Sequence, residues 1–464
     1  MTLAELLKNY RPEPKSRKKR IINGDLRILR VYCQRPYFTG SGVYLINLIE
    51  QTELKNIKQF VIFGLPADAD PPFEDVIPKD RYLCVYFKPE YDKSIYSAPD
   101  LDFYIAGMSD EMPYKSTKFS DFNKNMLESY LNAFANKIKE AIQKFKPNII
   151  HAHHLWLTTA LSRVLCPDLP MIATCHNTGL RQMILAKNLR KYIIKPIKDI
   201  DIIAVQNEHQ INVIKKQYDI NSNDSKFKIV EQGFNSKLFN ISFCDGNINH
   251  IVKNFDKNKY NIVYVGKLCF SKGVPQLLEA FKDISFEFNG KCKLYLVGAG
   301  TGAEKEEIER FVNKNKNNVE ILGQLSQSDL AILLKNCDLF VLPSFYDGFP
   351  KVLLESLACG CKVIVTDLPG LKDKLNIICK SDEFIQYIPL PKMKEIDKPK
   401  KEELPQFIAI LRDKLRYNIK KKIFIEKNQN PKIKNISNKI CEKYGSRALF
   451  NKYLHLYMEF KQIT

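Results

Sequence analysis

The sequence is short of glycine and has no long hydrophobic run. Glycine accounts for 19 of the 464 residues, about 4% against an average near 7%, so glycines that gather at the ends of apolar segments are informative. No run approaches the roughly 20 apolar residues that cross a bilayer, and residues 1–20 lack the apolar core of a secretory signal. Hydrophobic residues still make up 45% of the chain, enough for large cores. We therefore expect a soluble, cytoplasmic globular protein.

Regularly spaced cysteine pairs are also missing. None of the twelve cysteines forms a Cys-x-x-Cys motif. The closest two are Cys359 and Cys361, and others such as Cys84 and Cys337 lie inside apolar runs. Disulfide frameworks and structural zinc sites use close, regular spacings. The pattern indicates buried thiols in a reducing compartment and no metal site.

Acidic residues are outnumbered, with 52 Asp and Glu against 72 Lys and Arg and a net charge of +20. Such an excess is compatible with nucleic acid, anionic lipid or a phosphorylated substrate as a partner. Lysine also replaces arginine in ordinary surface segments, so biased usage explains most of the excess, and we expect no nucleic-acid partner. The basic stretch 187–198 (KNLRKYIIKPIK) is a candidate for peripheral contact with an anionic membrane, at its inner face.

Short apolar segments alternate with helical ones in two series. Residues 1–24 are polar and basic, and we expect them to form a loose arm. Strand-like runs separated by helices follow over 25–240, and a second series of five strands lies within 241–445. This alternation predicts right-handed crossovers and parallel sheets. The expected fold class is therefore α/β, with two doubly wound Rossmann-like domains facing a cleft and a final helix within 446–464.

A glycine-containing turn follows the first predicted strand. Thr39-Gly40-Ser41-Gly42 precedes a helix, where glycine lets a ligand approach the backbone and the helix start offers N–H groups to an anion. The motif is not a complete G-x-G-x-x-G, and no acidic residue is placed to bind a ribose. An anion site and a plain tight turn are equally compatible with these residues.

The densest group of polar residues follows the apolar strand DLFVLP in the second domain. Asp347 lies in the loop and Glu355 one to two turns into the next helix, so both can point past the end of the strand. The first amides of that helix, from Lys351, Val352 and Leu353, form a seat for an anion. This arrangement suits a ligand with both phosphates and hydroxyls. The alternative is a capped helix with Asp347 as the cap.

Two lysines follow another strand of the same domain. Lys267 and Lys272 come after NIVYVG, and we expect them at the same edge of the sheet as Asp347. Together they can neutralise a diphosphate without a metal and so stabilise a departing nucleotide. The alternative is an exposed, solvated lysine pair.

These motifs, in this order, resemble the signature of the GT-B glycosyltransferases of family 4, the group 1 glycosyl transferases. The match runs from Gly266 to Gly370, and the resemblance covers the chain from about 25 to 461 in outline. It implies a donor-binding C-terminal domain, an acceptor-binding N-terminal domain and a last helix that crosses back to the first domain. It also implies metal-independent transfer of a hexosyl-type sugar with retention of configuration, from a nucleotide-sugar that is most often a UDP-sugar, with no other cofactor. The implied acceptor is a glycan, a lipid-linked sugar or a small molecule, as in polysaccharide biosynthesis.

The resemblance also implies roles for single residues. Lys267 and Lys272 match the basic pair that holds the donor diphosphate, and Glu355 matches the residue that binds the ribose hydroxyls. Asp347 stands where the family has a longer Glu that contacts the donor sugar, which puts the sugar preference in question. His176, in a T-x-H motif, matches a histidine that contacts the transferring sugar and counts with both carboxylates as catalytic. The expected donor-binding set is completed by Gly42, Gly348, Phe349, Lys351 and Val352.

Other features look like sites but lack the context of one. Asp68-Ala-Asp70 and Asp100-Leu-Asp102 spell the D-x-D motif of the other large glycosyltransferase fold, but both lie outside any nucleotide-binding context. His151 and His153 place two imidazoles on one strand face, yet no third metal ligand is evident. Two other functions stay open: a sugar-nucleotide epimerase of the same fold, and a non-catalytic binding protein derived from a transferase.

Overall fold

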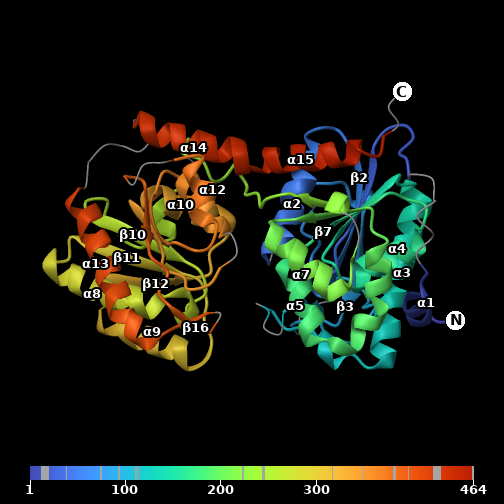
Figure 1. Ribbon diagram of the computed structural model, residues 1–464, viewed down its shortest axis with the longest axis horizontal. Helices are drawn as coiled ribbons and strands as arrows, with labels where there is room; N and C mark the ends of the chain where they lie inside the picture. Colours follow the sequence, from blue (N-terminus) through green and yellow to red (C-terminus); the bar gives the residue numbers. More distant parts are fainter. Residues whose placement is uncertain are drawn as a thin grey trace. The chain divides into compact units, whose positions relative to one another are not determined.

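The chain folds into two compact units, each built on a parallel sheet with helices on its faces (Figure 1). Unit 1 comprises Met1–Gln232 and Leu449–Thr464, and unit 2 comprises Gly233–Ala448. The predicted α/β class with two doubly wound domains is confirmed. The computed structural model describes the chain except for residues 12–19, 38, 74–75, 92–94, 110–111, 113, 222–223, 243–245, 316, 348–349, 380–382, 396, 422–429 and 462–464.

The boundary between the units lies earlier than the sequence indicates. The predicted boundary after residue 240 is wrong, because it falls inside unit 2. Phe234 and Phe239 are both buried in the core of unit 2, so the chain has already joined that core before the polar stretch that suggested the boundary.

Unit 1 contains a seven-stranded sheet with the order β3-β2-β1-β6-β7-β8-β9, in which all neighbours are parallel. Its strands are almost continuous apolar runs because helices cover both faces of a parallel sheet. The strands are β1 (Arg27–Val31), β2 (Lys58–Pro66), β3 (Tyr82–Phe87), β6 (Ile149–His153), β7 (Met171–Thr174), β8 (Ile202–Val205) and β9 (Phe227–Ile229), with a separate pair β4 (Ala106–Gly107) and β5 (Thr117–Lys118). The helices are α1 (Leu3–Asn9), α2 (Gly40–Glu53), α3 (Lys124–Phe145), α4 (Leu157–Leu165), α5 (Asn177–Leu185), α6 (Ile194–Lys198) and α7 (Glu208–Tyr218), with short 3-10 turns η1 (Lys79–Arg81), η2 (Phe119–Asp121), η3 (Lys187–Tyr192) and η4 (Asp224–Lys226).

Unit 2 contains a six-stranded parallel sheet with the order β12-β11-β10-β13-β14-β15. The strand order reverses beside β10, the switch point at which open α/β sheets bind ligands. The strands are β10 (Tyr260–Val265), β11 (Cys292–Val297), β12 (Val319–Gly323), β13 (Leu339–Leu342), β14 (Lys362–Thr366) and β15 (Ile385–Ile388), with a separate pair β16 (Met393–Glu395) and β17 (Lys398–Pro399). The helices are α8 (Val274–Glu287), α9 (Gly302–Lys314), α10 (Gln327–Asn336), α11 (Lys351–Ala358), α12 (Leu371–Asn376), α13 (Leu404–Lys420) and α14 (Pro431–Tyr444), with η5 (Ile248–His250), η6 (Phe270–Lys272) and η7 (Lys401–Glu403).

The last helix, α15 (Ser446–Met458), returns the chain to unit 1, as predicted. Phe450, Tyr453 and Tyr457 are buried in one apolar cluster with Ile28 of β1 and Ile172 of β7. The end of the chain therefore forms part of the core of unit 1.

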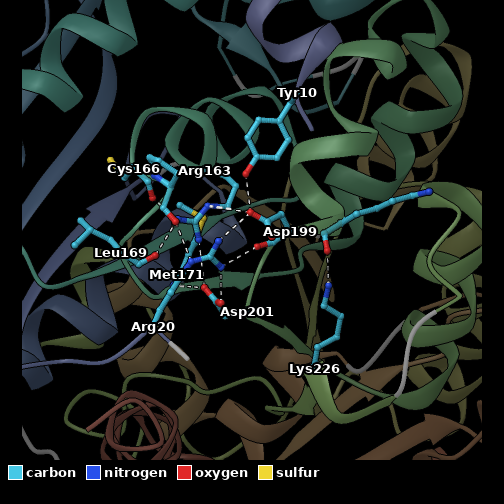
Figure 2. Close-up of polar contacts among 11 residues, drawn as sticks. Tyr10, Arg20, Arg163, Cys166, Leu169, Met171, Asp199, Asp201 and Lys226 are labelled. Atoms are coloured by element: carbon cyan, nitrogen blue, oxygen red, sulfur yellow. Dashed lines mark hydrogen bonds and ion pairs between the residues drawn. The ribbon is translucent and has the colours of Figure 1, made fainter. Parts of the chain in front are cut away.

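The N-terminal segment is anchored to unit 1 by charged side chains. The expectation of a loose arm is wrong for its first residues, because α1 is capped by Thr2 and buries Leu7. Figure 2 shows Tyr10 and Arg20 converging on two aspartates that precede β8. The Tyr10 hydroxyl donates to Asp199 Oδ2 at 2.6 Å. Arg20 lies 3.0 Å from Asp199 and 2.6 Å from Asp201.

A buried arginine completes this cluster. Arg163 of α4 has a fully buried side chain and lies 3.2 Å from Asp201 Oδ2. Asp201 also accepts the backbone N–H of Met171, the first residue of β7, at 2.9 Å. The cluster therefore lies at the amino ends of β7 and β8, whereas His176 follows the carboxyl end of β7.

Candidate active site

The predicted donor site of unit 2 lies at the carboxyl ends of two neighbouring strands. Lys267 and Lys272 follow β10, and Asp347 follows β13, its neighbour in the sheet. Because parallel strands end at the same edge, the topology brings these side chains to one edge, as expected. Lys267 is exposed, and its carbonyl accepts a hydrogen bond from Tyr264 OH at 2.7 Å, which fixes the turn after β10.

Lys272 and Asp347 form an ion pair. Lys272 Nζ lies 2.6 Å from Asp347 Oδ2, and it also donates to Tyr346 O at 3.2 Å. The residue before α11 is Pro350, and no side chain caps this helix. The N-cap position of α11 is thus occupied by Pro350 and not by Asp347, whose carboxylate pairs with a lysine from another loop.

Glu355 lies in α11 with only 4% of its side chain exposed. Its Oε1 is 3.1 Å from Lys351 Nζ, one turn earlier on the same helix. The backbone N–H of Leu353 donates to Pro350 O at 3.1 Å. The expectation that Leu353 offers a free amide to an anion is therefore wrong, while Lys351 and Val352 remain at the start of the helix.

Glycine is required where the strand ends of unit 2 meet. A Cβ on Gly273, which has a φ of +70°, would lie 2.0 Å from the carbonyl oxygen of Pro343 just after β13. A Cβ on Gly298 would lie 1.9 Å from the carbonyl oxygen of Gly266. These contacts explain why a chain poor in glycine keeps it here: a side chain would push the loops of the candidate site apart. The predicted site residues Gly348 and Phe349 lie outside the described residues.

In unit 1, His176 follows β7 and precedes α5. Its exposed fraction is 6%, and burial lowers its pKa to about 3. Its Nε2 is 3.3 Å from His153 Nδ1, and its ring is nearly perpendicular to that of Tyr44 at a centroid distance of 5.4 Å. His176 is therefore a neutral imidazole at neutral pH, able to form hydrogen bonds but not to serve as a general base.

Sequence analysis missed the tyrosines of the last helix that contact Thr174 and His151. Tyr453 OH lies 2.6 Å from Thr174 Oγ1, and Tyr457 OH lies 2.7 Å from His151 Nδ1. The only feature of the sequence that pointed to these contacts was the row of aromatic residues in the last helix. That row did not indicate which residues the helix packs against. Across the described residues, no group of three or more His, Cys, Asp or Glu side chains is placed to hold a metal ion.

Gly42 has a structural role in the turn before α2, and its donor-binding role stays a prediction. Its N–H donates to Thr39 Oγ1 at 3.1 Å, as part of the cap of α2, so this amide is not offered to a donor. A Cβ on Gly42 would lie 3.0 Å from Tyr37 N. The tight turn is thus the role that the geometry supports.

Three of the four lysines in the basic stretch 187–198 are exposed, and the fourth, Lys198, is paired with Asp219. Lys187, Lys191 and Lys195 are exposed, whereas Leu189 and Ile197 are buried. Among the helices that the structure describes, none is long and apolar enough to span a membrane.

Two family models match the chain. The model described as Glycosyltransferase Family 4 matches residues 39–235, and the one described as Glycosyl transferases group 1 matches residues 247–376. His176 lies in the first match, and the lysines and carboxylates of the donor site lie in the second.

Three known proteins illustrate the similarity. Uncharacterized glycosyltransferase MJ1178 of Methanocaldococcus jannaschii is 29% identical over 244 residues, which are 50% of this chain and 60% of that protein. The N,N'-diacetylbacillosaminyl-diphospho-undecaprenol alpha-1,3-N-acetylgalactosaminyltransferase of Campylobacter jejuni is 32% identical over 123 residues, 26% of this chain and 30% of that one. Both alignments span less than two thirds of these relatives. Anabaena HepE, solved in complex with UDP and glucose, has a TM-score of 0.56 at 13% identity, over 94% of this chain and 100% of that chain. The motif order, both family models and the shared fold show that the chain belongs to the GT-B glycosyltransferases.

Proposed function

We propose that this protein is a retaining glycosyltransferase that moves a hexosyl-type sugar from a nucleotide-sugar to a glycan, lipid-linked or small-molecule acceptor. The observation that carries the proposal is the pairing of Lys272 with Asp347 at the switch point of unit 2, with the buried Glu355 in the helix that follows the same loop. A UDP-sugar is the proposed donor, supported by the UDP and glucose bound to HepE. A lipid-linked acceptor is supported by the relative from Campylobacter jejuni, whose name specifies a diphospho-undecaprenol substrate.

The donor diphosphate would be held by Lys267 and Lys272. A lysine ammonium has three N–H donors, so Lys272 can keep Asp347 and Tyr346 O as partners and offer its third donor to a phosphate oxygen. Positive charge fixed beside the leaving diphosphate stabilises the negative charge that develops on it. The lysines would therefore supply the positive charge that a metal ion supplies in metal-dependent enzymes.

The remaining residues would hold the rest of the donor. Glu355 accepts hydrogen bonds from the ribose hydroxyls, and Asp347 accepts one from the sugar that is transferred. His176 contacts the sugar that is transferred. Because its pKa of about 3 keeps it uncharged, its contribution is a hydrogen bond and not proton abstraction.

The proposed reaction needs no separate protein base. The acceptor hydroxyl attacks the anomeric carbon on the face from which the diphosphate leaves. The bond between that carbon and the phosphate oxygen breaks, the new glycosidic bond forms, and the leaving β-phosphate oxygen takes the hydroxyl proton. Attack and departure on one face retain the configuration.

A panel of UDP-, GDP- and ADP-sugars tests the proposal, with release of the nucleoside diphosphate as the readout. A transferase releases it in the presence of an acceptor, and activity should persist in EDTA. An epimerase returns an altered sugar nucleotide without net release, and a binding protein does neither. Complete loss of activity in EDTA with recovery in manganese would contradict the lysine-based mechanism.

We also propose that the protein works in the cytoplasm and touches the inner face of the membrane through Lys187, Lys191 and Lys195. This proposal is supported by the exposure of the three lysines in a stretch whose apolar residues Leu189 and Ile197 are buried. A surface of this kind suits an enzyme whose acceptor is carried on a lipid.

A further inference from the structure

Four of the seven histidines of the chain lie together in unit 1. The rings of His151 and His153 stack with centroids 4.7 Å apart, and those of His153 and His176 are nearly parallel at 5.6 Å. His154 lies 4.7 Å from His176. Burial lowers the pKa of all four well below the ordinary value, so each ring is neutral at neutral pH and carries one proton. The position of that proton decides which ring nitrogen donates and which accepts.

Arg30 decides the position of the proton on His151. A guanidinium only donates, and Arg30 Nη1 lies 3.0 Å from His151 Nδ1, so Nδ1 accepts and Nε2 carries the proton. That proton is donated to Thr174 Oγ1 at 2.8 Å. Thr174 Oγ1 is also hydrogen-bonded to Tyr453 OH at 2.6 Å, and Tyr453 OH to Tyr44 OH at 2.9 Å. This chain of hydrogen bonds holds the His151 ring in one orientation.

His153 stacks on this fixed ring with an angle of 18° between the planes. Its Nδ1 is 3.3 Å from His176 Nε2, and its Nε2 is buried without a hydrogen-bond partner among the described residues. A buried N–H without an acceptor is rarer in proteins than an unused acceptor, so the proton of His153 belongs on Nδ1. It is then donated to His176 Nε2, which places the proton of His176 on Nδ1.

We propose that His153 is a positioning residue for His176: through its Nδ1–H it holds the ring of His176 and fixes it in the Nδ1–H tautomer. His176 then keeps one polar ring group, an N–H donor, for the sugar. The hydrogen bond between the histidines concerns the protein alone, and only the contact with the sugar rests on the proposed function. His153 itself touches neither donor nor acceptor in this account.

Nitrogen NMR of protein labelled with ¹⁵N-histidine tests the proposal without any substrate. The shifts of the two ring nitrogens distinguish the protonated one from the unprotonated one, and the signals of His176 are those that disappear in His176→Gln. The wild-type protein should show His176 as the Nδ1–H tautomer. An Nε2–H tautomer in the wild type would overturn the proposal.

Two substitutions of His153 sharpen the test. His153→Phe keeps an aromatic ring but removes the donor, so His176 should revert to the Nε2–H tautomer that a free neutral imidazole prefers. His153→Asn places an amide N–H near the former Nδ1–H and should restore the Nδ1–H form. An unchanged tautomer in His153→Phe contradicts the proposal, and if that variant does not fold, the wild type and His153→Asn decide.

His154→Phe is the matched control. His154 is buried next to His176, but its Nδ1 lies 3.3 Å from Thr178 Oγ1, and the described structure has no hydrogen bond between the two histidines. The tautomer of His176 should therefore stay unchanged in this variant. A change as large as that in His153→Phe would show that general packing, and not His153, sets the tautomer.

Kinetics separate this proposal from the proposed function. In His153→Phe, kcat should fall roughly fivefold, the effect of losing one neutral hydrogen bond, with KM for the donor nearly unchanged and kcat recovered in His153→Asn. If the tautomers respond as expected but the wild type uses no sugar nucleotide, the positioning role stands and the proposed function fails. If the wild type is active and the tautomer is independent of residue 153, the positioning role fails alone.

Discussion

Lys272 Nζ and Asp347 Oδ2 lie 2.6 Å apart, and this ion pair joins the turn after β10 to the loop after β13. The carboxylate of Asp347 is therefore fixed at the switch point of unit 2 by a residue that we assign to the diphosphate. Asp347 can thus align the sugar while Lys272, which contacts it, aligns the phosphates. We therefore expect the two carboxylates of the site to act on different parts of the donor: Asp347 on the sugar and Glu355 on the ribose.

Asp347→Asn should affect the intact donor and spare the free nucleotide. Because Asp347 is assigned to the sugar, the Kd of UDP should change less than about threefold. The value of kcat/KM for the UDP-sugar should fall about 10- to 100-fold, the effect of losing a hydrogen bond to a charged group. Calorimetry and initial rates measure the two quantities.

Asp283→Asn is a suitable control, because this exposed carboxylate pairs with Arg412, away from the switch point. It should leave both quantities unchanged. Equal weakening of UDP and UDP-sugar by Asp347→Asn would show that our division of roles is wrong.

Stability should fall with acid because of the buried histidines. The pKa of His176 is about 3 in the folded protein, against about 6.5 in the unfolded chain. Below about pH 6.5 the unfolded state binds protons at these histidines and the folded state does not. The free energy of unfolding is therefore constant above that pH and falls below it. The loss approaches about 1.4 kcal/mol per pH unit for each such histidine. Urea unfolding between pH 5 and pH 8 measures the slope.

His153→Phe removes one of these groups and should reduce that slope. The exposed His209 is the matched control, and His209→Gln should leave the slope as in the wild type. A slope in His153→Phe as steep as in the wild type would contradict the assignment of acid sensitivity to the cluster.

The sequence was informative where structure is local and uninformative where partners are distant. The strands of both sheets follow from continuous apolar runs, and the lysines and carboxylates of unit 2 follow from their places after strands. The N-terminal helix did carry a local signal, the capping box of Thr2 and Glu5, but the anchoring of Arg20 depends on Asp199 and Asp201, far along the chain. The surroundings of His151 depend on Tyr457, 306 residues away. No local pattern carries such contacts, because they exist only once the sheet has assembled.

The N-terminal anchor should contribute strongly to stability. The Arg20 side chain is 9% exposed and contacts two aspartates, so Arg20→Ala leaves two largely buried carboxylates with one guanidinium fewer. Removing one partner of such a cluster costs about 2 to 4 kcal/mol. Urea unfolding of the full chain measures the change in the free energy of unfolding.

Lys8→Ala provides the comparison, because Lys8 is an exposed residue of α1. Its effect should stay within about 0.5 kcal/mol, as for ordinary surface substitutions. If Arg20→Ala were as mild as Lys8→Ala, the charged cluster in Figure 2 would not stabilise unit 1.

Membrane binding should depend on charge if the basic stretch is a contact surface. Each basic residue near an anionic surface contributes about 1 kcal/mol, so reversing Lys187, Lys191 and Lys195 to Glu should lower binding to anionic vesicles more than about 100-fold. Binding by the wild type should also weaken as salt rises. Vesicle sedimentation measures both effects.

Three exposed lysines of another surface serve as the control for total charge. Reversal of Lys124, Lys139 and Lys146, in or just after α3, changes the net charge equally. This variant should bind anionic vesicles nearly as well as the wild type. Equal losses in the two triple variants would leave overall charge as the explanation.

The central claim, that unit 2 holds the nucleotide of the donor, is tested most directly by titrating UDP into Glu355→Gln. Glu355 is assigned to the ribose, so UDP and the UDP-sugar should both bind about 10- to 100-fold more weakly than to the wild type. Glu320→Gln, which removes a carboxylate paired with Lys293 in the same unit, should bind UDP as the wild type does. Thermal unfolding checks that both variants are folded. If the wild type binds UDP and folded Glu355→Gln binds it equally well, the nucleotide does not lie where this account places it.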